Sequence, residues 1–293
     1  MLKKLVFRLS VLAVILTGCD KDNTSDPTPG LPPLPDRHDI GSGIEDETFR
    51  KYCYTNFDAD LDGKISPQEA AAVTRIGLSY SRVGTLAGIG YFPNLETLEC
   101  QHCEQLVSAD LKHNRKIATV GGETFAYCSA LTDVVLPEEV TAIGEQAFMQ
   151  SSSLRGIVLP EGLVSIGESA FGRCRSLTEI TIPERVAEIG EATCFGCKNL
   201  AAFHGKFASE DHKCLIADGK LIAFAPASGL KIYTIPDGVM QIGRCAFFGC
   251  NALNTIILPR SVIGIGDSAF YGCTGLTSVT IPEGVTSIGY GAF

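Results

Sequence analysis

The sequence predicts an α/β solenoid, in which short parallel strands from successive repeats stack into a sheet behind a small helix-loop-helix element. The main observation is an Ile-Gly dipeptide followed by Ala-Phe, which recurs in steps of 23 residues. A second pattern, Leu-x-x-apolar-x-apolar, recurs in the same register and ends each time in proline. This self-similarity indicates a solenoid and outweighs the one or two globular domains that 293 residues would suggest.

The composition argues against several classes of protein. With 45% hydrophobic and 19% charged residues, the chain is not expected to be disordered. Lys and Arg total 24 against 33 Asp and Glu, and the net charge of -9 argues against binding nucleic acid. No long apolar run occurs beyond the N-terminus, so no internal membrane span is expected.

Residues 1–18 have the pattern of a signal peptide. Three basic residues precede the apolar run 9–16, which is too short for a stable membrane span. Residues 16–19, Leu-Thr-Gly-Cys, resemble the lipobox of bacterial lipoproteins. The resemblance implies that a signal peptidase cuts before Cys19 and that the Cys19 thiol carries the lipid anchor. The alternative is an ordinary secretion signal with a chance cysteine.

Residues 19–43 are predicted to form an extended tether, because five prolines lie between residues 27 and 35. Removal of residues 1–18 leaves 21 basic against 33 acidic residues. Anionic lipid would repel such a chain, so only the acyl chains would hold it to the membrane. Asp20-Lys21-Asp22 also resembles the surface-export signals of Bacteroidetes lipoproteins. We therefore expect a cell-envelope, outer-membrane lipoprotein that is exposed at the surface.

Residues 44–72 are predicted to form a helix-loop-helix around an acidic loop. Residues 58–69 read Asp-Ala-Asp-Leu-Asp-Gly-Lys-Ile-Ser-Pro-Gln-Glu, which resembles the EF-hand loop. An entering helix is expected from Glu45 to Phe57, and Ser66 has the sequence context of an N-cap for the exiting helix. The predicted ligands are Asp58, Asp60, Asp62, the Lys64 carbonyl, Ser66 and a bidentate Glu69.

These hard oxygen ligands favour Ca²⁺ as the cofactor. No second loop of this kind follows, so we expect one structural ion that clamps the element rather than a paired calcium sensor. An unpaired extracellular loop should bind at about 10⁻⁴ to 10⁻³ M. The alternative is an Asp-rich turn that binds nothing.

Seven repeats are predicted over residues 120–293. Their openings are separated by 23 residues, with one step of 53. The openings are Val120, Ile143, Ile166, Ile189, Ile242, Ile265 and Ile288. The strand pattern begins at Leu131, Leu154, Leu177, Leu200, Leu230, Leu253 and Leu276.

Each repeat is expected to supply one short strand, which ends at proline because proline cannot donate to a ladder. Gly190 and its equivalents are expected to allow a tight turn, and the Ala-Phe pair to bury a ring between coils. The long step contains Asp218-Gly219 between two apolar runs. This pattern predicts a β-hairpin inserted near residues 207–229, in place of the usual turn-and-helix side of one coil.

Residues 73–119 carry shorter leucine-rich repeats, of which residues 95–106 match the pattern L-x-x-L-x-L-x-x-N/C-x-L. The repeats of 120–293 resemble the BspA-type leucine-rich repeats of bacterial surface proteins. The acidic loop followed by residues 73–114 is similar to the front end of related Bacteroidetes lipoproteins. The resemblance implies adhesion to host or neighbouring-cell components.

Most of the twelve cysteines are expected to be structural. Five lie eight residues after a repeat opening: Cys128, Cys174, Cys197, Cys250 and Cys273. We expect a buried ladder without disulfides, since stacked Cβ vectors run parallel. Cys194-x-x-Cys197 permits a thiol oxidoreductase as an alternative, although Cys194 occupies a phenylalanine position. The sequence contains no H-E-x-x-H, nucleophile-elbow or phosphate-loop motif, so an enzyme is not expected.

The candidate partner-binding face is the row of outward strand positions, because solenoids bind along their strand surface. These positions are Val135, Val158, Thr181, His204, Thr234, Ile257 and Thr280. Plain β-propensity is an equal explanation for the row. The expected function is binding of a protein or glycan partner at the cell surface, and a scaffold role in an envelope complex is the alternative. The last repeat stops at Phe293 before its cysteine, which suggests a truncated chain or an end that meets a partner.

Overall fold

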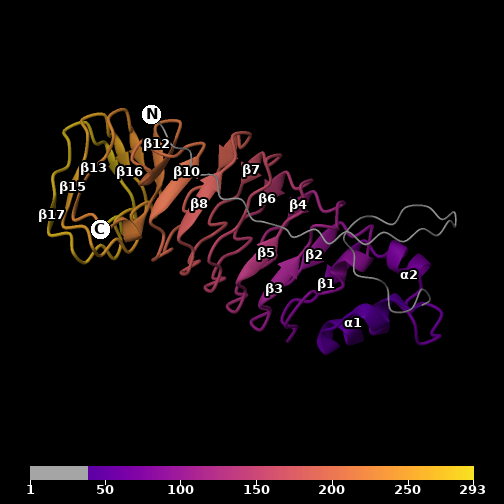
Figure 1. Ribbon diagram of the computed structural model, residues 1–293. Helices are drawn as coiled ribbons and strands as arrows, with labels where there is room; N and C mark the ends of the chain where they lie inside the picture. Colours follow the sequence, from indigo (N-terminus) through magenta and orange to yellow (C-terminus); the bar gives the residue numbers. More distant parts are fainter. Residues whose placement is uncertain (1–38) are drawn as a thin grey trace, which may run out of the picture. The chain divides into compact units, whose positions relative to one another are not determined.

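The computed structural model describes residues 39–293 (Figure 1). The expected lipid-anchor residue, Cys19, and most of the predicted tether lie outside these residues. Within the described part of the chain, no helix combines the length and the apolar character needed to cross a membrane.

A short helical element opens the described chain. It consists of the 3-10 helix η1 Ile40–Gly43 and the helices α1 Glu47–Phe57 and α2 Pro67–Ala72. Helix α1 begins after Asp46, whose carboxylate accepts a hydrogen bond from Phe49 N at 2.8 Å. The η1 segment differs from the expected extended tether, because Ile40 N donates to Ile65 O at 2.8 Å and its side chain is buried.

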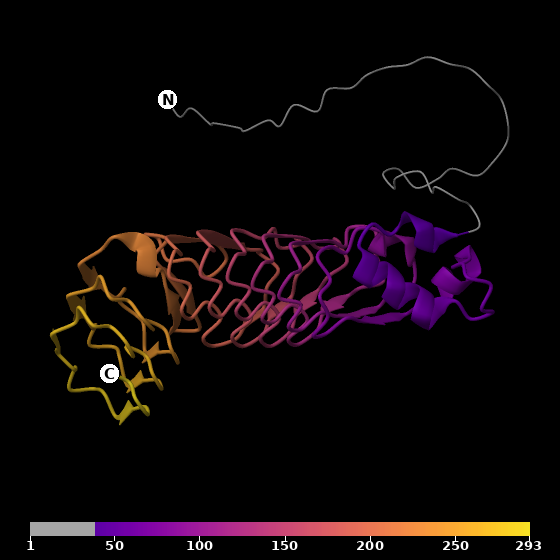
Figure 2. The ribbon, with the colours of Figure 1, turned by 90° about the horizontal axis from the view of Figure 1, so that it is seen from below.

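The rest of the chain is a stack of coils, as Figure 2 shows. Each regular coil contributes a short strand to each of two sides, and residues 73–293 contain no α-helix. On the Ile-Gly side lie β1 Arg75–Gly77, β2 Thr97–Glu99, β4 Thr119–Val120, β6 Ala142–Ile143, β7 Ser165–Ile166, β9 Glu188–Ile189, β12 Lys220–Phe224, β14 Gln241–Ile242, β16 Gly264–Ile265 and β18 Ser287–Ile288. On the Leu-Pro side lie β3 Ser108–Asp110, β5 Asp133–Val135, β8 Glu179–Ile182, β10 Ala202–Gly205, β13 Ile232–Thr234, β15 Thr255–Ile257 and β17 Ser278–Val279. Two further 3-10 helices are η2 Ile89–Tyr91 and η3 Pro226–Ser228.

The parallel-strand solenoid is therefore confirmed, with a second strand per coil that the sequence did not predict. The expected strands of the Leu-Pro side pair in parallel, for example β13 with β15 and β15 with β17. The Ile-Gly dipeptides also pair from coil to coil, because Gly167 N donates to Ile143 O at 2.8 Å. Strands on two sides of the coil, rather than strands on one side and a turn on the other, thus enclose the core.

Glycine was expected at Gly190 to allow a tight turn, but the structure shows a different reason for it. Its φ is not in the left-handed region; instead, a Cβ on Gly190 would lie 2.4 Å from Glu168 N of the preceding coil. A Cβ on Gly167 would lie 2.5 Å from Glu145 N. Glycine is required because the backbones of adjacent coils touch there, while left-handed φ values occur two residues later, at Ser169 and Ala192.

The Ala-Phe pair buries its ring, as predicted. Phe125, Phe148 and Phe171 stack with centroids 5.4 Å apart and are fully buried. A second column runs through Phe224 and Phe247 in later coils, with centroids 4.9 Å apart.

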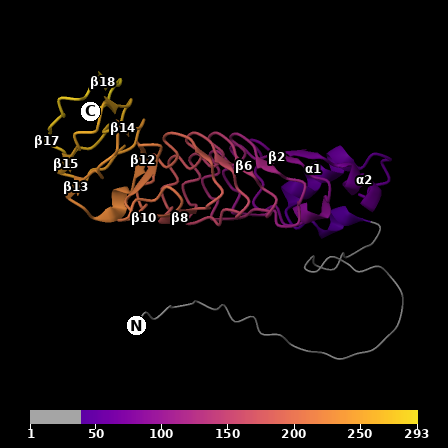
Figure 3. The same cartoon turned by 90° about the horizontal axis from the view of Figure 1, so that it is seen from above.

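A hairpin separates these two columns. Strand β11 Cys214–Ala217 pairs antiparallel with β12 around Asp218 and Gly219, which both have positive φ. Leu215 and Ile222 pack into the first core, whereas Leu221 and Phe224 pack into the second. The hairpin therefore divides one apolar core into two, and β12 takes the place of an Ile-Gly strand by pairing with β14 (Figure 3).

The cysteine ladder is buried and free of disulfides in the described residues. Its thiols also make a hydrogen bond that the sequence did not reveal. Cys174 Sγ donates to Phe148 O of the preceding coil at 3.1 Å, and Cys197 Sγ donates to Phe171 O at 3.0 Å. Ser151 makes the same bond to Phe125 O at 2.6 Å. The ladder position therefore holds a small hydrogen-bond donor in each of these coils.

Candidate functional site

The predicted binding face lies on the Leu-Pro side and points outward. Val135, Thr181 and Ile257 are exposed residues of β5, β8 and β15, and Thr234 is exposed in β13. His204 of β10 is half-buried. Thr280 is exposed just after the end of β17.

Val158 is the exception in this row, because it does not belong to a strand. Residues 156–158 occupy the position of a strand between β5 and β8 but pair with neither. Gly156 weakens a strand there, since glycine has no side chain to pack against its neighbours. Val158 is left 85% exposed.

A groove of about 620 Å³ lies at this interruption, which we call the central groove. Val135, Val158 and Thr181 from three successive coils line it. The charged side chains around it are acidic except for one: Asp133, Glu138, Glu179 and Arg155. The sequence placed the three outward residues together, but Gly156 was its only signal that the middle strand would be missing.

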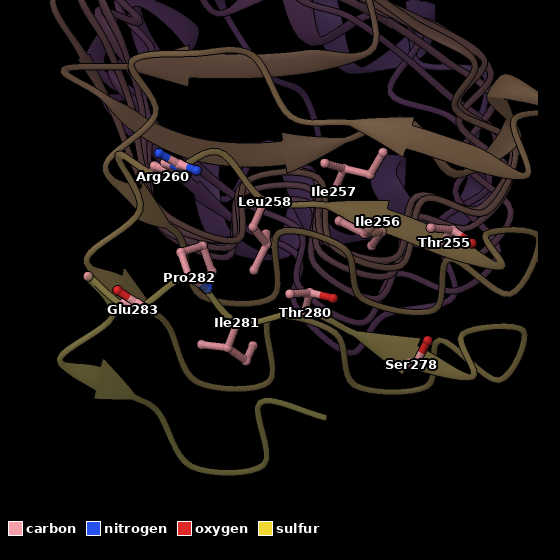
Figure 4. A pocket seen from close by; sticks show the side chains of 11 residues that line it. Thr255, Ile256, Ile257, Leu258, Arg260, Ser278, Thr280, Ile281, Pro282 and Glu283 are labelled. Atoms are coloured by element: carbon pink, nitrogen blue, oxygen red, sulfur yellow. The ribbon is translucent and has the colours of Figure 1, made fainter.

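A second groove of about 730 Å³, the C-terminal groove, lies between the coils of β15 and β17 (Figure 4). Ile257 and Thr280 of the predicted face line it. Arg260 and Glu283 lie at one end, and Thr255 and Ser278 lie at the other. Five of the seven predicted face residues thus border a groove.

The remaining two, His204 and Thr234, border neither groove. His204 Nε2 lies 3.4 Å from the Glu179 carboxylate of the preceding coil. Its ring also lies 5.1 Å from that of His212. His204 therefore does not line the central groove but contacts Glu179, which does.

The acidic loop brings three of its predicted ligands together. Carboxylate oxygens of Asp58, Asp60 and Glu69 lie within 4.8 Å of one another, a spacing that fits a single Ca²⁺. Gly63 has φ +82, as the sharp turn of such a loop requires. The Asp62 carboxylate instead accepts a hydrogen bond from Lys64 N at 2.8 Å and lies outside this cluster.

Glu69 holds the loop closed together with Asp58, whose carboxylate accepts hydrogen bonds from Asp62 N and Gly63 N. Glu69 Oε1 accepts a hydrogen bond from Ala59 N at 2.7 Å, and its Oε2 accepts one from Ser66 N at 2.8 Å. Ser66 Oγ in turn caps α2. The backbone donor of Ser66, followed by that of Ala59, lowers the pKa of Glu69. A bound cation would offset the mutual repulsion of these carboxylates. Each oxygen of Asp58 and Asp60 accepts at most one hydrogen bond and retains a lone pair for the cation, whereas each oxygen of Glu69 already accepts two.

The paired cysteines offer no accessible thiol. Cys194 and Cys197 are at most 2% exposed. A hydrogen bond with Cys197, together with burial, raises the pKa of Cys194, which disfavours the thiolate. Cys103 differs, because a hydrogen bond from Cys100 lowers its pKa to about 7, but its side chain is also fully buried.

One group of aromatic residues was missed by the sequence reasoning. Tyr80, His102 and Tyr127 stack face to face where successive coils pass from the Ile-Gly side to the Leu-Pro side. The three residues occupy the same position in successive repeats. Tyr127, for example, lies seven residues after the repeat opening at Val120. Alignment of the repeats at this position would have shown the aromatic run.

Coils that each contribute short parallel strands, joined by buried Asn and Cys side chains, define a leucine-rich-repeat solenoid. Asn114 makes the joining bonds in the early coils, donating to Ile89 O and Phe92 O at 3.1 Å. The sequence matches the BspA type leucine rich repeat region in six copies, over residues 99–208 and 221–293. The chain belongs to this family, and its matching repeats begin earlier than residue 120.

Several solved structures are similar to this chain, and one of them has a TM-score above 0.5. A leucine-rich repeat protein from Eubacterium ventriosum has a TM-score of 0.56 and 22% identity, with 80% of this chain and 59% of that chain covered. A leucine rich cell surface protein from Faecalibacterium prausnitzii has a TM-score of 0.47 and 24% identity, over 76% and 64%. A leucine-rich repeat protein from Bacteroides ovatus has a TM-score of 0.40 and 20% identity, over 67% and 79%. This chain thus spans less than two thirds of two of these relatives. No protein of curated function matches the sequence.

Proposed function

We propose that this protein is a lipid-anchored cell-surface binding protein that holds a protein or glycan partner on its Leu-Pro side. The observation that carries the proposal is that the central and C-terminal grooves both lie on that side and are bordered by the predicted face. The similar protein from Faecalibacterium prausnitzii is described as a cell surface protein.

The central groove favours a protein partner with basic side chains. Its rim carries Asp133, Glu138 and Glu179 against Arg155 alone, and the whole chain has a net charge of -9. Val158 presents an exposed apolar side chain at the centre. An apolar centre with a charged rim is typical of protein interfaces.

The two alternatives predict different results. A scaffold in an envelope complex would use the same face for another envelope protein, so a partner from the same cell would favour it. A thiol oxidoreductase requires a reactive cysteine pair, and the burial of Cys194 and Cys197 argues against it. Selective thiol reactivity of this pair in the folded protein would favour the enzyme.

The binding test uses the exposed Val158. Val158→Glu places a charge in the central groove without disturbing the core, because the side chain is 85% exposed. We expect it to weaken binding by at least about tenfold in a screen of matrix proteins and neutral glycans. Val164→Glu is the control, since Val164 is 46% exposed and lines neither groove. Equal binding by parent and Val158→Glu would refute the central groove as the site.

We further propose that the acidic loop binds one structural Ca²⁺ through Asp58, Asp60 and Glu69. At about 10 to 100 times the dissociation constant, Ca²⁺ should stabilise the protein by about 1.4 to 2.7 kcal/mol. The best variant is Asp60→Ala, because Glu69 also caps α2 and its loss would destabilise the protein without metal. Asp60→Ala should abolish the Ca²⁺-dependent rise in melting temperature. A parent protein that melts equally with and without Ca²⁺ would overturn the proposal.

The lipid anchor is proposed on the lipobox alone. Cys19→Ser should abolish acyl labelling and release the protein from the membrane fraction. Continued labelling of that variant would contradict the anchor.

A further inference from the structure

An aromatic stack with one exposed end, at Tyr80, runs along the first three coils. The rings of Tyr80 and His102 are 4.8 Å apart and inclined by 12°. Those of His102 and Tyr127 are 4.2 Å apart and inclined by 7°. His102 is covered on both faces by its neighbours, whereas Tyr80, at the end of the stack, is 71% exposed. One face of the Tyr80 ring is therefore open at the stacking position.

The backbone at this position favours glycine, which makes the aromatic residues notable. Tyr80, His102 and Tyr127 all have left-handed φ, at 64°, 57° and 61°. The next two coils place Gln150 and Arg173 at the same position, also with left-handed φ, and later coils place Gly249 and Gly272 there. The equivalence is shown by the backbone, because Tyr127 N donates to Met149 O and Gly249 N donates to Tyr271 O in the following coil. Large side chains are disfavoured in this conformation. Stacking offsets the strain at His102, but the open face of Tyr80 contributes nothing to stability.

A recess of about 480 Å³ lies beside Tyr80. It is lined by Tyr80, Ser81, Arg82, His102, Glu104 and Gln105. Arg82, Glu104 and Gln105 have planar polar groups and are exposed. Among the described residues, none of these three side chains makes a hydrogen bond, and the Glu104 carboxylate lies only within 4.0 Å of His102 Nδ1. Free donors and acceptors thus line the recess beside the exposed Tyr80 side chain.

We propose that this recess binds a neutral hexopyranose ring, which packs against the Tyr80 side chain. A pyranose has one apolar face of C–H groups and a rim of hydroxyl groups. The apolar face suits an aromatic ring, and paired hydroxyls suit the planar groups of Arg82, Glu104 and Gln105. A neutral sugar is favoured because Glu104 balances Arg82 and because the chain carries a net charge of -9. The recess shares no residue with either groove, so this site is separate from the proposed partner-binding face.

Two measurements test the proposal and separate a free sugar from a glycan. Saturation-transfer NMR with lactose reports binding of the free disaccharide, and an array of neutral hexose-terminated glycans reports binding of larger chains. We expect binding in at least one of them, with the strongest saturation on the C–H face of one ring. Tyr80→Ala should weaken it about tenfold or more, and Tyr80→Phe should retain it. Arg82→Ala should also weaken it.

The controls distinguish this site from the proposed function. Tyr271→Ala removes another exposed tyrosine, 53% exposed and outside the recess, and should bind as the parent does. Val158→Glu should bind the sugar normally, because it alters only the central groove. Circular dichroism should show that Tyr80→Ala is folded. Failure of the parent to bind either probe overturns the inference, and so does a sugar that Tyr80→Ala binds as well as the parent; neither result bears on the grooves.

Discussion

Replacing Cys174 by alanine or by serine tests whether the ladder stabilises the solenoid through hydrogen bonds or through packing alone. Cys174 is fully buried, and its Sγ donates to Phe148 O at 3.1 Å. Burial raises the pKa of Cys174 well above its ordinary value, so the thiol keeps the proton that it donates. Alanine removes both the donor and the sulfur. Serine removes the sulfur but keeps a donor, as Ser151 shows at the equivalent position.

The magnitudes follow from these contacts. Loss of the hydrogen bond should cost about 1 kcal/mol, and loss of the buried sulfur about 1 kcal/mol more. Cys174→Ala should therefore lower the free energy of unfolding by about 2 kcal/mol, and Cys174→Ser by about half of that. For a chain of this size, 2 kcal/mol corresponds to a fall of about 4 to 8 °C in melting temperature.

The assay is urea unfolding at pH 7 in a reducing buffer, with melting temperature as a second readout. The natural serine provides the matched control: Ser151→Ala should lose stability, and Ser151→Cys should keep the donor to Phe125 O. If the alanine and serine variants of Cys174 are equally destabilised, the hydrogen bond contributes nothing and the ladder acts by packing alone.

Three further predictions concern the coils. Gly167→Ala should destabilise the fold by several kcal/mol or prevent folding, because its Cβ would lie 2.5 Å from Glu145 N. Gly156→Ala is the control, since a Cβ there meets no atom within 4 Å and should leave the melting temperature unchanged. Equal melting temperatures of the two variants would contradict the close approach at Gly167. Burial is the largest of the causes that raise the pKa of six described thiols, so these thiols ionise first in the unfolded state. Stability should therefore fall by about 1.4 kcal/mol per pH unit for each of these thiols above about pH 9. Equal urea midpoints at pH 8 and pH 10 would oppose this prediction. Burial alone would raise the pKa of Glu191, but the Lys220 ammonium, with its Nζ 2.5 Å from the carboxylate, outweighs burial together with other donors, and the net pKa is lowered. The Glu191 carboxylate therefore stabilises the fold only at pH values above its folded pKa. Glu191→Gln should lower the free energy of unfolding by about 1 kcal/mol at pH 7 and leave it unchanged in acid. Urea unfolding at pH 7 and in acid measures both values, and an equal loss in acid would exclude the ion pair as the cause.

The repeat content could be predicted because it is local. Each period of 23 residues contains its own strand, proline, phenylalanine and donor position, so the order of residues along the chain is enough to indicate which of them are buried. The stacked Phe148 and Phe171 confirm this reasoning. The outward row was predicted for the same reason, since side chains alternate along a strand.

The binding surfaces could be predicted only in part. Val135 and Thr181 were placed on one face, but the groove between them arises because residues 156–158 fail to pair with either neighbouring strand. Pairing is a contact between coils, and the only local signal was Gly156. The acidic loop was predicted from spacing, while the displacement of Asp62 from the other carboxylates depends on the folded backbone.

The sequence by itself determined the repeat, the family, the buried ladder and the outward row of the Leu-Pro side. The tertiary structure decided which residues of different coils meet. His102 and Tyr127 are 25 residues apart in the chain and 4.2 Å apart as rings, and Gly190 is required because of the backbone at Glu168. A repeat pattern specifies the content of one coil, whereas contacts between coils depend on how closely their backbones approach, which is fixed only when the coils stack.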